Sequence, residues 1–306
     1  MDTDTKTQLE HLLGTTIRHV TPLSGGQIAA VYAVTFDSSS FSTPSSTLST
    51  SHTAVSQAAV SQAVVKVDLE GDLACEGRML HYLHDKSHLP VPQVYAQDGG
   101  LLVLEHLPGN GRLNADAERH MAELLAGLHN VTADAYGFAE DTLIGSLTLP
   151  NGWHADWGRF FAAKRLLHFA NLAHKRGRLP EKTLTRVQKL AERVPEWLEP
   201  NPPGLVHGDI WSGNVLAQDG IITGVIDPAI YYADPEVDLA YIDLFGTFGQ
   251  AFWRRYQEIR PLADAFWQYR RALYSLFPLL VHVYYFGSGY VAGVEQKLAV
   301  LEQRFS

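Results

Sequence analysis

The 306-residue sequence contains a single cysteine, Cys75. One thiol cannot close an intramolecular disulfide or build a cysteine-rich zinc site, so small disulfide scaffolds and zinc ribbons are excluded. Basic residues are also few, because 24 Lys and Arg stand against 33 Asp and Glu and the formal net charge is −9. We therefore expect no nucleic-acid partner and no binding to an anionic membrane.

The chain also lacks several targeting and catalytic signatures. Its N-terminus has no basic start followed by an apolar stretch, which together with the lone cysteine predicts a cytoplasmic protein. Residues 272–294 carry no Asp, Glu, Lys or Arg, yet Pro278, His282 and the glycines at 287 and 289 divide them into pieces typical of buried helices, not of a membrane span. Neither GxSxG nor GxxxxGK[ST] occurs, so hydrolase and P-loop readings have no support.

Serine and threonine are concentrated in residues 37–62, where ten Ser and four Thr fill 14 of 26 positions. With few large apolar side chains, this insert cannot bury enough surface to offset the entropy of ordering, which predicts a mobile surface loop. A phosphorylated regulatory segment is the alternative.

A chain of 306 residues predicts two lobes at about 150 residues per domain. Strand patterns occupy residues 20–36, around a glycine turn, and 63–67, 94–95 and 101–105, with one amphipathic helix through Glu76, Met79, Leu80 and Leu83. Helical periodicity dominates beyond residue 107, at 115–130, 156–176, 181–198 and much of 238–303. We expect an α+β bilobal fold, with a small β-rich lobe at residues 1–106 and a larger, mostly helical lobe at 107–306.

The helical half contains one strand-rich island, residues 204–230, which carries Asp209, Asn214 and Asp227. The chain runs outward from Asn214, turns at residues 218–220 and returns toward Asp227. Such a hairpin brings its ends to neighbouring strands about 5 Å apart, so the two side chains are expected to face one another. Two side-chain oxygens placed together suit Mg²⁺.

Phosphoryl transfer to a hydroxyl needs the groups that this sequence supplies in order. An aspartate on a loop accepts the hydroxyl proton, an Asn five residues later and a second Asp hold the metal, and a strand lysine paired with a helix glutamate binds the nucleotide phosphates. Asp209, Asn214, Asp227, Lys66 and Glu76 match these parts. Lys66 alone on a valine strand would be read as a lysine protecting a sheet edge, and Asp227 before Pro228 as a turn initiator.

The motifs HGDxWSGN from His207, IDPAxYYxDxEVDLAY from Ile226 and HxYYFGSGY from His282 resemble the fructosamine kinase (ketosamine-3-kinase) family, in the aminoglycoside-phosphotransferase branch of the protein-kinase-like fold. The resemblance covers nearly the whole chain. It implies ATP-dependent phosphorylation of the 3-hydroxyl of a ketosamine, a deglycation-type repair reaction, with Mg²⁺ as the metal. The expected partner is a small-molecule ketosamine or glycated amine.

Further roles follow from the resemblance residue by residue. It implies Asp209 as the proton acceptor, Asn214 and Asp227 as metal ligands, and Lys66 with Glu76 at the phosphates, although Glu70 is close enough in sequence to compete with Glu76. The remaining candidates are Gly25 and Gly26 at the phosphates, Leu104, Glu105, His106 and Leu107 at the adenine, Trp211, Asp234 and His282 at the substrate, and His207 and Asp238 as supports of the catalytic loop.

Three points stay open at this stage. Trp211 either lines the acceptor site or only packs. The glycine loop lacks the GxGxxG of protein kinases, so its phosphate contacts are undefined. The same machinery also fits a kinase for another small alcohol, such as an aminoglycoside or amino alcohol, or a nucleotide-binding module without turnover.

Overall fold

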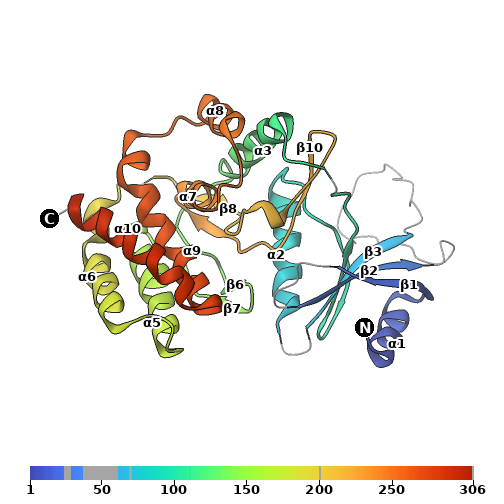
Figure 1. Cartoon of the computed structure of the whole chain (residues 1–306). Coiled ribbons are helices and arrows are strands. Elements are labelled where there is room, and N and C mark those ends of the chain that lie inside the picture. The colour runs from blue at the N-terminus through green and yellow to red at the C-terminus, as the bar shows by residue number, and fades with distance from the viewer. Residues whose placement is uncertain (24–28, 37–60, 69–70, 110, 200, 305–306) are drawn as a thin grey trace.

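The computed structural model describes residues 1–23, 29–36, 61–68, 71–109, 111–199 and 201–304. Its N-terminal part is a five-stranded antiparallel sheet with the strand order β1-β2-β3-β5-β4 and two helices. Figure 1 shows the sheet at one end of the molecule and helix α2 between the sheet and the helical part. The elements are α1 (Thr3–Leu13), β1 (Ile17–Pro22), β2 (Ala30–Phe36), β3 (Gln62–Val67), α2 (Leu73–Lys86), β4 (Val94–Asp98) and β5 (Leu101–Glu105).

The two faces of this sheet bury different residues because side chains alternate along a strand. Ala63 and Val65 of β3 pack with Leu9 and Leu13 of α1. Val64 of β3, in contrast, packs in the cluster that includes helix α2. Lys66 follows Val64 by two residues, so both side chains lie on the same face of the sheet. The Lys66 ammonium group is therefore on the side that faces α2.

Helix α2 begins and packs for reasons that can be read in its residues. The Asp72 side chain accepts a hydrogen bond from the Cys75 N–H, which caps the first turn. Gly77 lets the helix approach the sheet, because a Cβ there would lie 2.3 Å from Gln97 Oε1 and 3.4 Å from Leu102. The helix is therefore held close to β4 and β5, with Glu76 next to β3.

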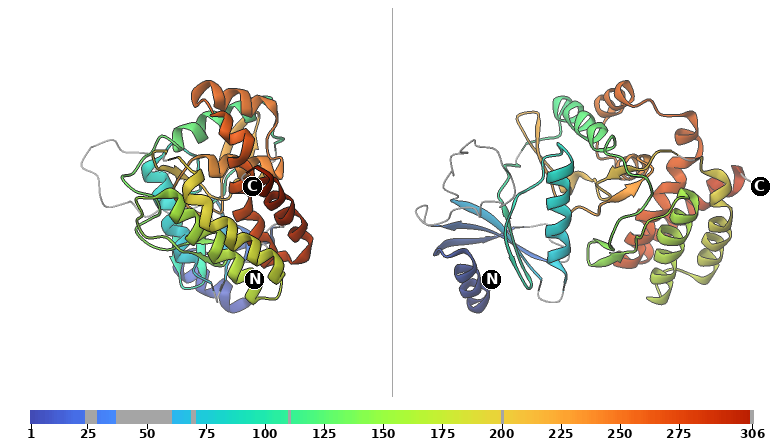
Figure 2. Two further views of the ribbon diagram at one scale, coloured as in Figure 1. Left: turned by 90° about the vertical axis from the view of Figure 1, so that its left-hand side faces the viewer. Right: turned by 180° about the vertical axis from the view of Figure 1, so that it is seen from behind.

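The larger part of the chain is helical, as the two further views in Figure 2 show. Its described residues also form three short antiparallel strand pairs. Its helices are α3 (Ala115–Leu128), α4 (Trp157–Phe160), α5 (His168–Lys175), α6 (Glu181–Trp197), α7 (Glu236–Phe245), α8 (Gln250–Ile259), α9 (Arg271–Phe286) and α10 (Val291–Arg304). π-Helical segments η1 (Phe161–Leu167) and η3 (Phe266–Arg270) lead into α5 and α9, and 3₁₀ turns are η2 (Ser212–Asn214) and η4 (Ser288–Tyr290). The strand pairs are β6 (Thr142–Ile144) with β7 (Leu147–Leu149), β8 (Gly204–Val206) with β11 (Tyr231–Ala233), and β9 (Val215–Gln218) with β10 (Ile221–Val225).

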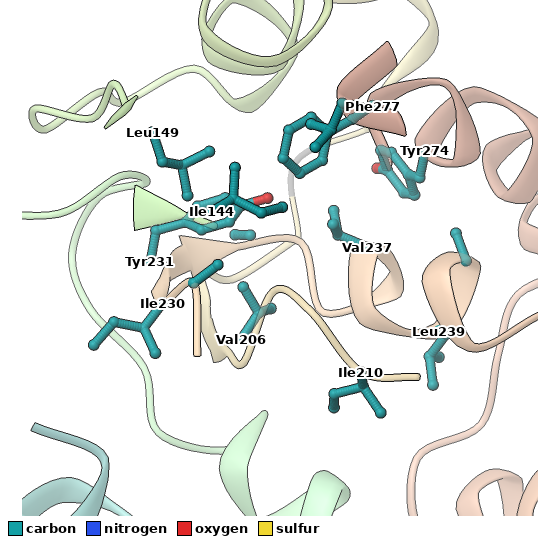
Figure 3. Packing of buried hydrophobic residues seen from close by; sticks show 14 of the residues in the cluster. Ile144, Leu149, Val206, Ile210, Ile230, Tyr231, Val237, Leu239, Tyr274 and Phe277 are labelled. Carbon is teal, nitrogen blue, oxygen red and sulfur yellow. The ribbon is translucent and has the colours of Figure 1, made fainter. Parts of the chain in front are cut away.

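One large hydrophobic cluster joins the two lobes. It contains Leu80 and Leu83 of α2 together with the buried faces of the C-terminal helices. Figure 3 shows Val206 and Ile210, which lie on either side of residues 207–209, in this cluster with Ile230 and other buried residues. The core therefore holds the chain on both sides of the segment that carries Asp209.

The structure confirms the α+β bilobal fold with a small sheet lobe and a larger helical one. The uncharged stretch 272–294 forms most of α9, η4 and the start of α10, and no helix among the described residues is long and apolar enough to cross a membrane. The boundary at residue 106 stays a prediction. The insert at 37–62 lies outside the described residues except for its last two positions, and Gln62 belongs to β3 instead of the insert.

A buried ion pair connects α7 to the start of α9. Arg270 Nε and Nη2 donate to the two carboxylate oxygens of Glu236 at 2.6 and 2.7 Å, and the two side chains are 5% and 8% exposed. Desolvation raises the pKa of Glu236 to about 7, against the opposing effect of the Arg270 guanidinium. Glu236 thus depends on Arg270 for its ionisation, and the buried Arg270 charge depends on Glu236 for compensation.

Removing only one partner of this pair leaves a buried charge without compensation. We expect Glu236→Ala to lower the free energy of unfolding by about 3–5 kcal/mol. The double variant Glu236→Leu/Arg270→Met removes both charges. Its free energy of unfolding is expected to fall by less than that of Glu236→Ala. Guanidinium unfolding curves check both values, and a double variant that is less stable than the single one would contradict the explanation.

Candidate active site

Lys66 of β3 contacts carboxylates from both lobes. Its ammonium nitrogen lies 2.5 Å from Glu76 Oε1 of α2 and also forms an ion pair with Asp227 Oδ1, in the loop after β10. The Lys66 and Glu76 side chains are 10% and 14% exposed, while Asp227 is 46% exposed. Glu76 is therefore the helix partner of Lys66 in this structure, and Glu70 lies outside the described residues.

Burial and charge act in opposite directions on this cluster. Desolvation by itself would lower the pKa of Lys66, but the carboxylates of Glu76 and Asp227 outweigh it and raise that pKa. Desolvation raises the pKa of Glu76, and the Lys66 ammonium opposes this effect. Lys66 therefore stays protonated at the junction of the lobes, and its ammonium group is a candidate contact for a phosphate.

The loop that carries Asp209 depends on a glycine. Gly208 has φ +84°, and a Cβ at this position would lie 2.3 Å from the carbonyl oxygen of Ala229. The Ala229 N–H donates to the His207 carbonyl at 2.8 Å, and Tyr231 pairs with Val206 across β11 and β8. These backbone bonds fix the Asp209 loop against the loop that follows Asp227.

The carboxylate of Asp238 in α7 holds the same loop. Its two carboxylate oxygens accept the N–H groups of His207 at 2.9 Å and Gly208 at 2.8 Å, and its side chain is fully buried. His129 Nε2 lies 3.2 Å from Asp238 Oδ2, and His129 Nδ1 lies 2.7 Å from the Tyr256 hydroxyl. Desolvation lowers the pKa of His129, so a neutral ring that donates to Asp238 and accepts from Tyr256 fits both contacts.

Asn214 is fixed between Asp209 and Asp227. Its side-chain nitrogen donates to the carbonyl oxygen and to Oδ2 of Asp209, each at 2.9 Å. The Ile226 N–H donates to the Asn214 carbonyl at 2.9 Å, which extends the β9–β10 pairing by one step and places Asn214 beside the start of the Asp227 turn. Because the amide nitrogen is used by Asp209, the Asn214 side-chain oxygen is left to face a cation.

The donor set fits a magnesium ion. Asp227 has φ +56°, a left-handed conformation rare for a residue with a side chain and typical of functional turns. Asn214 and Asp227 would supply two hard oxygen ligands, and Mg²⁺ in kinases takes others from phosphates and water. Among the described residues no group of three or more His, Cys, Asp or Glu could hold a metal ion, so binding there would need those additional oxygens.

Asp209 is partly exposed next to this donor set. Desolvation raises its pKa to about 7, while hydrogen bonding to Tyr241 and Asn214 lowers it. A carboxylate with a pKa near neutrality suits proton transfer. Sequence reasoning missed Tyr241, which lies three residues after Asp238 on α7, and this helical spacing is a signal that could have indicated it.

The candidate substrate residues differ in position. Trp211 is 37% exposed, and its ring covers Gly213, where a Cβ would lie 2.4 Å from it. His282 lies in an aromatic cluster with ring-centroid distances of 4.9 Å to Phe245 and 4.9 Å to Tyr290, and Phe245 is 4.9 Å from Tyr241. Trp211 and His282 thus stay predicted substrate residues.

Asp234, a further candidate for the substrate site, lies in a buried hydrogen-bond network, and its contact with a substrate stays a prediction. Its side chain is 1% exposed, and its oxygens accept hydrogen bonds from the Tyr274 hydroxyl at 2.8 Å, Asn201 Nδ2 at 3.1 Å and the Glu236 N–H at 3.0 Å. A substrate could reach it only by breaking this buried network. Asp234 holds the start of α7 in place.

The segment expected at the adenine lies at the end of β5. The Glu105 N–H donates to the Gln93 carbonyl at 2.8 Å, so the Glu105 carbonyl is the better candidate for adenine. The Leu104 side chain is buried in the large cluster, and the His106 side chain is exposed. Leu107 packs over Gly224 of β10, where a Cβ would lie 2.4 Å from Leu107. Gly25 and Gly26 lie outside the described residues.

Kinases that phosphorylate small alcohols combine a sheet lobe bearing a Lys–Glu pair with a helical lobe bearing the catalytic carboxylate. The chain is a phosphotransferase of this class, with an alcohol group as acceptor. A family profile described as fructosamine kinase matches residues 1–304, and the chain belongs to the fructosamine kinase family.

Relatives and solved structures agree with this assignment. A probable ketoamine kinase of Synechocystis sp. is 40% identical over 220 residues, 69% of this chain and 71% of the relative. One of Lactiplantibacillus plantarum is 29% identical over 296 residues, 96% of this chain and 98% of the relative. The crystal structure of a candidate fructosamine-3-kinase from Thermobifida fusca has a TM-score of 0.79 at 28% identity and covers 97% of this chain and 98% of its own. An aminoglycoside phosphotransferase, APH(4)-Ia, has a TM-score of 0.64 at 18% identity, covers 98% of each chain, and shares the fold.

His207 makes a testable contribution to the pH dependence of stability. Burial lowers the pKa of His207 to about 4, although the Asp238 and Asp227 carboxylates oppose it. The unfolded chain has a histidine pKa of about 6.5 and binds the extra proton, so stability is lost as pH falls from 6.5 toward 4. For one such group the loss between pH 7.5 and pH 5 is about 2 kcal/mol.

We expect His207→Asn to flatten this dependence, because its amide oxygen can accept the Asp209 N–H as His207 Nδ1 does but does not titrate. Guanidinium unfolding at pH 7.5 and pH 5 measures the change in both proteins. Other titrating groups are common to the two proteins and cancel in the difference. Equal losses in the two proteins would show that His207 is not the group responsible.

Proposed function

We propose that this enzyme transfers the γ-phosphoryl group of ATP to the 3-hydroxyl of a ketosamine, the sugar adduct that glycation leaves on an amine, as a step of deglycation. The observation that carries the proposal is the Lys66–Glu76–Asp227 ion-pair cluster next to the Asn214–Asp209 hydrogen bond. Family membership supports the acceptor class, and the similarity to the Thermobifida protein, a candidate fructosamine-3-kinase, supports the 3-hydroxyl. The related folds solved with AMP-PNP and with ADP support ATP as the donor.

The proposed reaction assigns a task to each group. Asp209 accepts the proton of the sugar hydroxyl while the hydroxyl oxygen bonds to the γ-phosphorus. The bond between the γ-phosphorus and the bridging oxygen breaks, and ADP leaves with that oxygen. Lys66, held by Glu76, neutralises phosphate oxygens. Mg²⁺, held by Asn214 and Asp227, would supply charge neutralisation at the transferring phosphoryl group. Backbone groups near Glu105 and Leu107 would bind the adenine.

The substrate class can be tested with a panel of acceptors. Purified protein, ATP and Mg²⁺ are incubated with fructosyl-lysine, ribulosyl-lysine, an aminoglycoside and an amino alcohol, and ADP release is followed. We expect turnover with a ketosamine and a ³¹P–¹H NMR correlation that places phosphate on the 3-hydroxyl. Turnover with the aminoglycoside alone would show that the acceptor is an aminoglycoside and not a ketosamine. If the protein consumed no ATP with any of the four acceptors, the proposal would be refuted.

The role of Asp209 gives a sharper prediction. Asp209→Asn keeps an oxygen that can accept from Asn214 but cannot take a proton, so we expect kcat to fall by about 10²- to 10⁴-fold with the KM for ATP little changed. The matched control is Asp264→Asn, at an exposed position of the helical lobe, which should keep full activity. Near-normal turnover in Asp209→Asn would remove Asp209 as the proton acceptor.

A further inference from the structure

Helix α2 presents different residues to the two lobes. Glu76 points to Lys66 of β3. Arg78 and Tyr82 are four residues apart and therefore share one face of the helix, nearly opposite to Glu76. That face contacts the helical lobe, where Arg78 Nε lies 3.3 Å from Glu140 Oε1. A rotation of α2 that broke the contacts of one face would also move the other.

The contact of Tyr82 is the more specific one. Its hydroxyl lies 3.0 Å from the hydroxyl of Tyr232, and its ring packs edge-on against Phe138 with centroids 4.9 Å apart. The Arg78–Glu140 pair is close to half-exposed and so adds little. Tyr232 is 4% exposed, and desolvation, with the hydrogen bond to Tyr82, raises its pKa, so its hydroxyl stays protonated.

Tyr232 is in turn fixed to the catalytic segments. Its N–H and carbonyl groups exchange hydrogen bonds of 2.8 Å with Gly137, and β11 pairs Tyr232 with Leu205 of β8. Residues 207–209 follow directly after β8, and Asp227 lies five residues before Tyr232. The Tyr82–Tyr232 contact therefore connects α2 to the rigid frame that carries Asp209 and Asp227.

We propose that the Tyr82–Tyr232 hydrogen bond is a positioning device for phosphoryl transfer, which sets the orientation of α2 so that Glu76 holds Lys66 in place for the nucleotide phosphates. The inference rests on the proposed function, in which Lys66 binds those phosphates. Tyr82 acts through Glu76 and is a positioning residue.

The charges around Lys66 explain why the orientation matters. Lys66 contacts both Glu76 and Asp227, which compete for one ammonium group. If α2 turned away, Lys66 would be left with Asp227 alone. A tight Lys66–Asp227 pair would withdraw a cation from the phosphates and a carboxylate from the metal. With Glu76 in its observed position, the Lys66 ammonium group is shared between two carboxylates and is not held by Asp227 alone.

Tyr82→Phe tests the proposal, because it removes one hydroxyl and keeps the ring on Phe138. A hydrogen bond of about 1 kcal/mol corresponds to roughly a fivefold effect, so we expect the KM for ATP and the Kd for AMP-PNP with Mg²⁺ to rise by about 3- to 10-fold. The KM for the ketosamine should change less than about twofold. The matched control is Tyr269→Phe, which removes a hydroxyl that donates to the Trp197 carbonyl in the helical lobe, and its KM for ATP should be unchanged.

Combined variants separate positioning from a general loss of stability. In a Glu76→Gln background, Tyr82→Phe should add less than about twofold to the KM for ATP, since the residue through which it acts has already been changed. Tyr232→Phe should raise the KM for ATP as Tyr82→Phe does. The double variant Tyr82→Phe/Tyr232→Phe should have the same KM for ATP as each single variant. Thermal unfolding verifies that each variant is folded at the assay temperature.

Each other outcome decides against the proposal. An unchanged KM for ATP in Tyr82→Phe, or an equal rise in the Glu76→Gln background, would overturn it. Either result would refute only the positioning role of Tyr82, provided that the wild type transfers phosphate from ATP and that Lys66→Ala abolishes ATP binding. If the wild type does not use ATP with any acceptor, the proposed function fails and the inference fails with it.

Discussion

The arrangement of the two lobes depends on one buried ammonium group, that of Lys66. It lies on the face of the sheet that packs against α2, and a lysine there is tolerated only with anionic partners. Glu76 supplies one partner from the sheet lobe and Asp227 supplies the other from the helical lobe. The same contacts that compensate the charge therefore connect the strand, the helix and the β9–β10 hairpin, and they place a cation at the junction of the lobes, where we propose that the nucleotide phosphates bind.

The helical lobe meets a second constraint, which is to hold strained loops in a catalytic geometry. Asp227 has φ +56°, and such a conformation of a residue with a side chain persists only when its surroundings compensate the strain, whereas Gly208 adopts its positive φ without strain. Asp238 provides two hydrogen bonds to the backbone of residues 207 and 208, and its remaining contact with His129 is buried. The hydrophobic cluster around Val206 and Ile230 completes the support (Figure 3). The supported backbone carries the partly exposed Asp209 side chain, which accepts a hydrogen bond from Asn214.

The sequence predicted the parts of this site that rest on local patterns. A lysine in a valine strand, a glutamate at the start of an amphipathic face and an Asn–Asp hairpin follow from periods of two and 3.6 residues and from a turn. It could not show contacts between distant segments, such as His129 with Asp238 or Tyr82 with Tyr232, which are 109 and 150 residues apart. The three-residue strands β6, β7 and β11 are too short for any period to appear. The buried partners of Asp234 were also hidden, because an acidic residue in a motif looks the same in the sequence whether it contacts a substrate or a buried tyrosine and asparagine.

The charges gathered at the site also bear on what it can bind. Lys66 is the cation among Glu76, Asp209, Asp227 and Asp238, and the adjoining His207 and His129 are kept neutral by burial, which lowers the pKa of each. An excess of carboxylates raises the cost of ionising Asp209, whose pKa desolvation and Asp227 raise to about 7. A divalent cation would reverse this balance and favour the ionised base. A nucleotide delivered without a metal would face mostly negative groups, which supports the proposal that phosphate arrives with Mg²⁺ and that the acceptor carries an ammonium group.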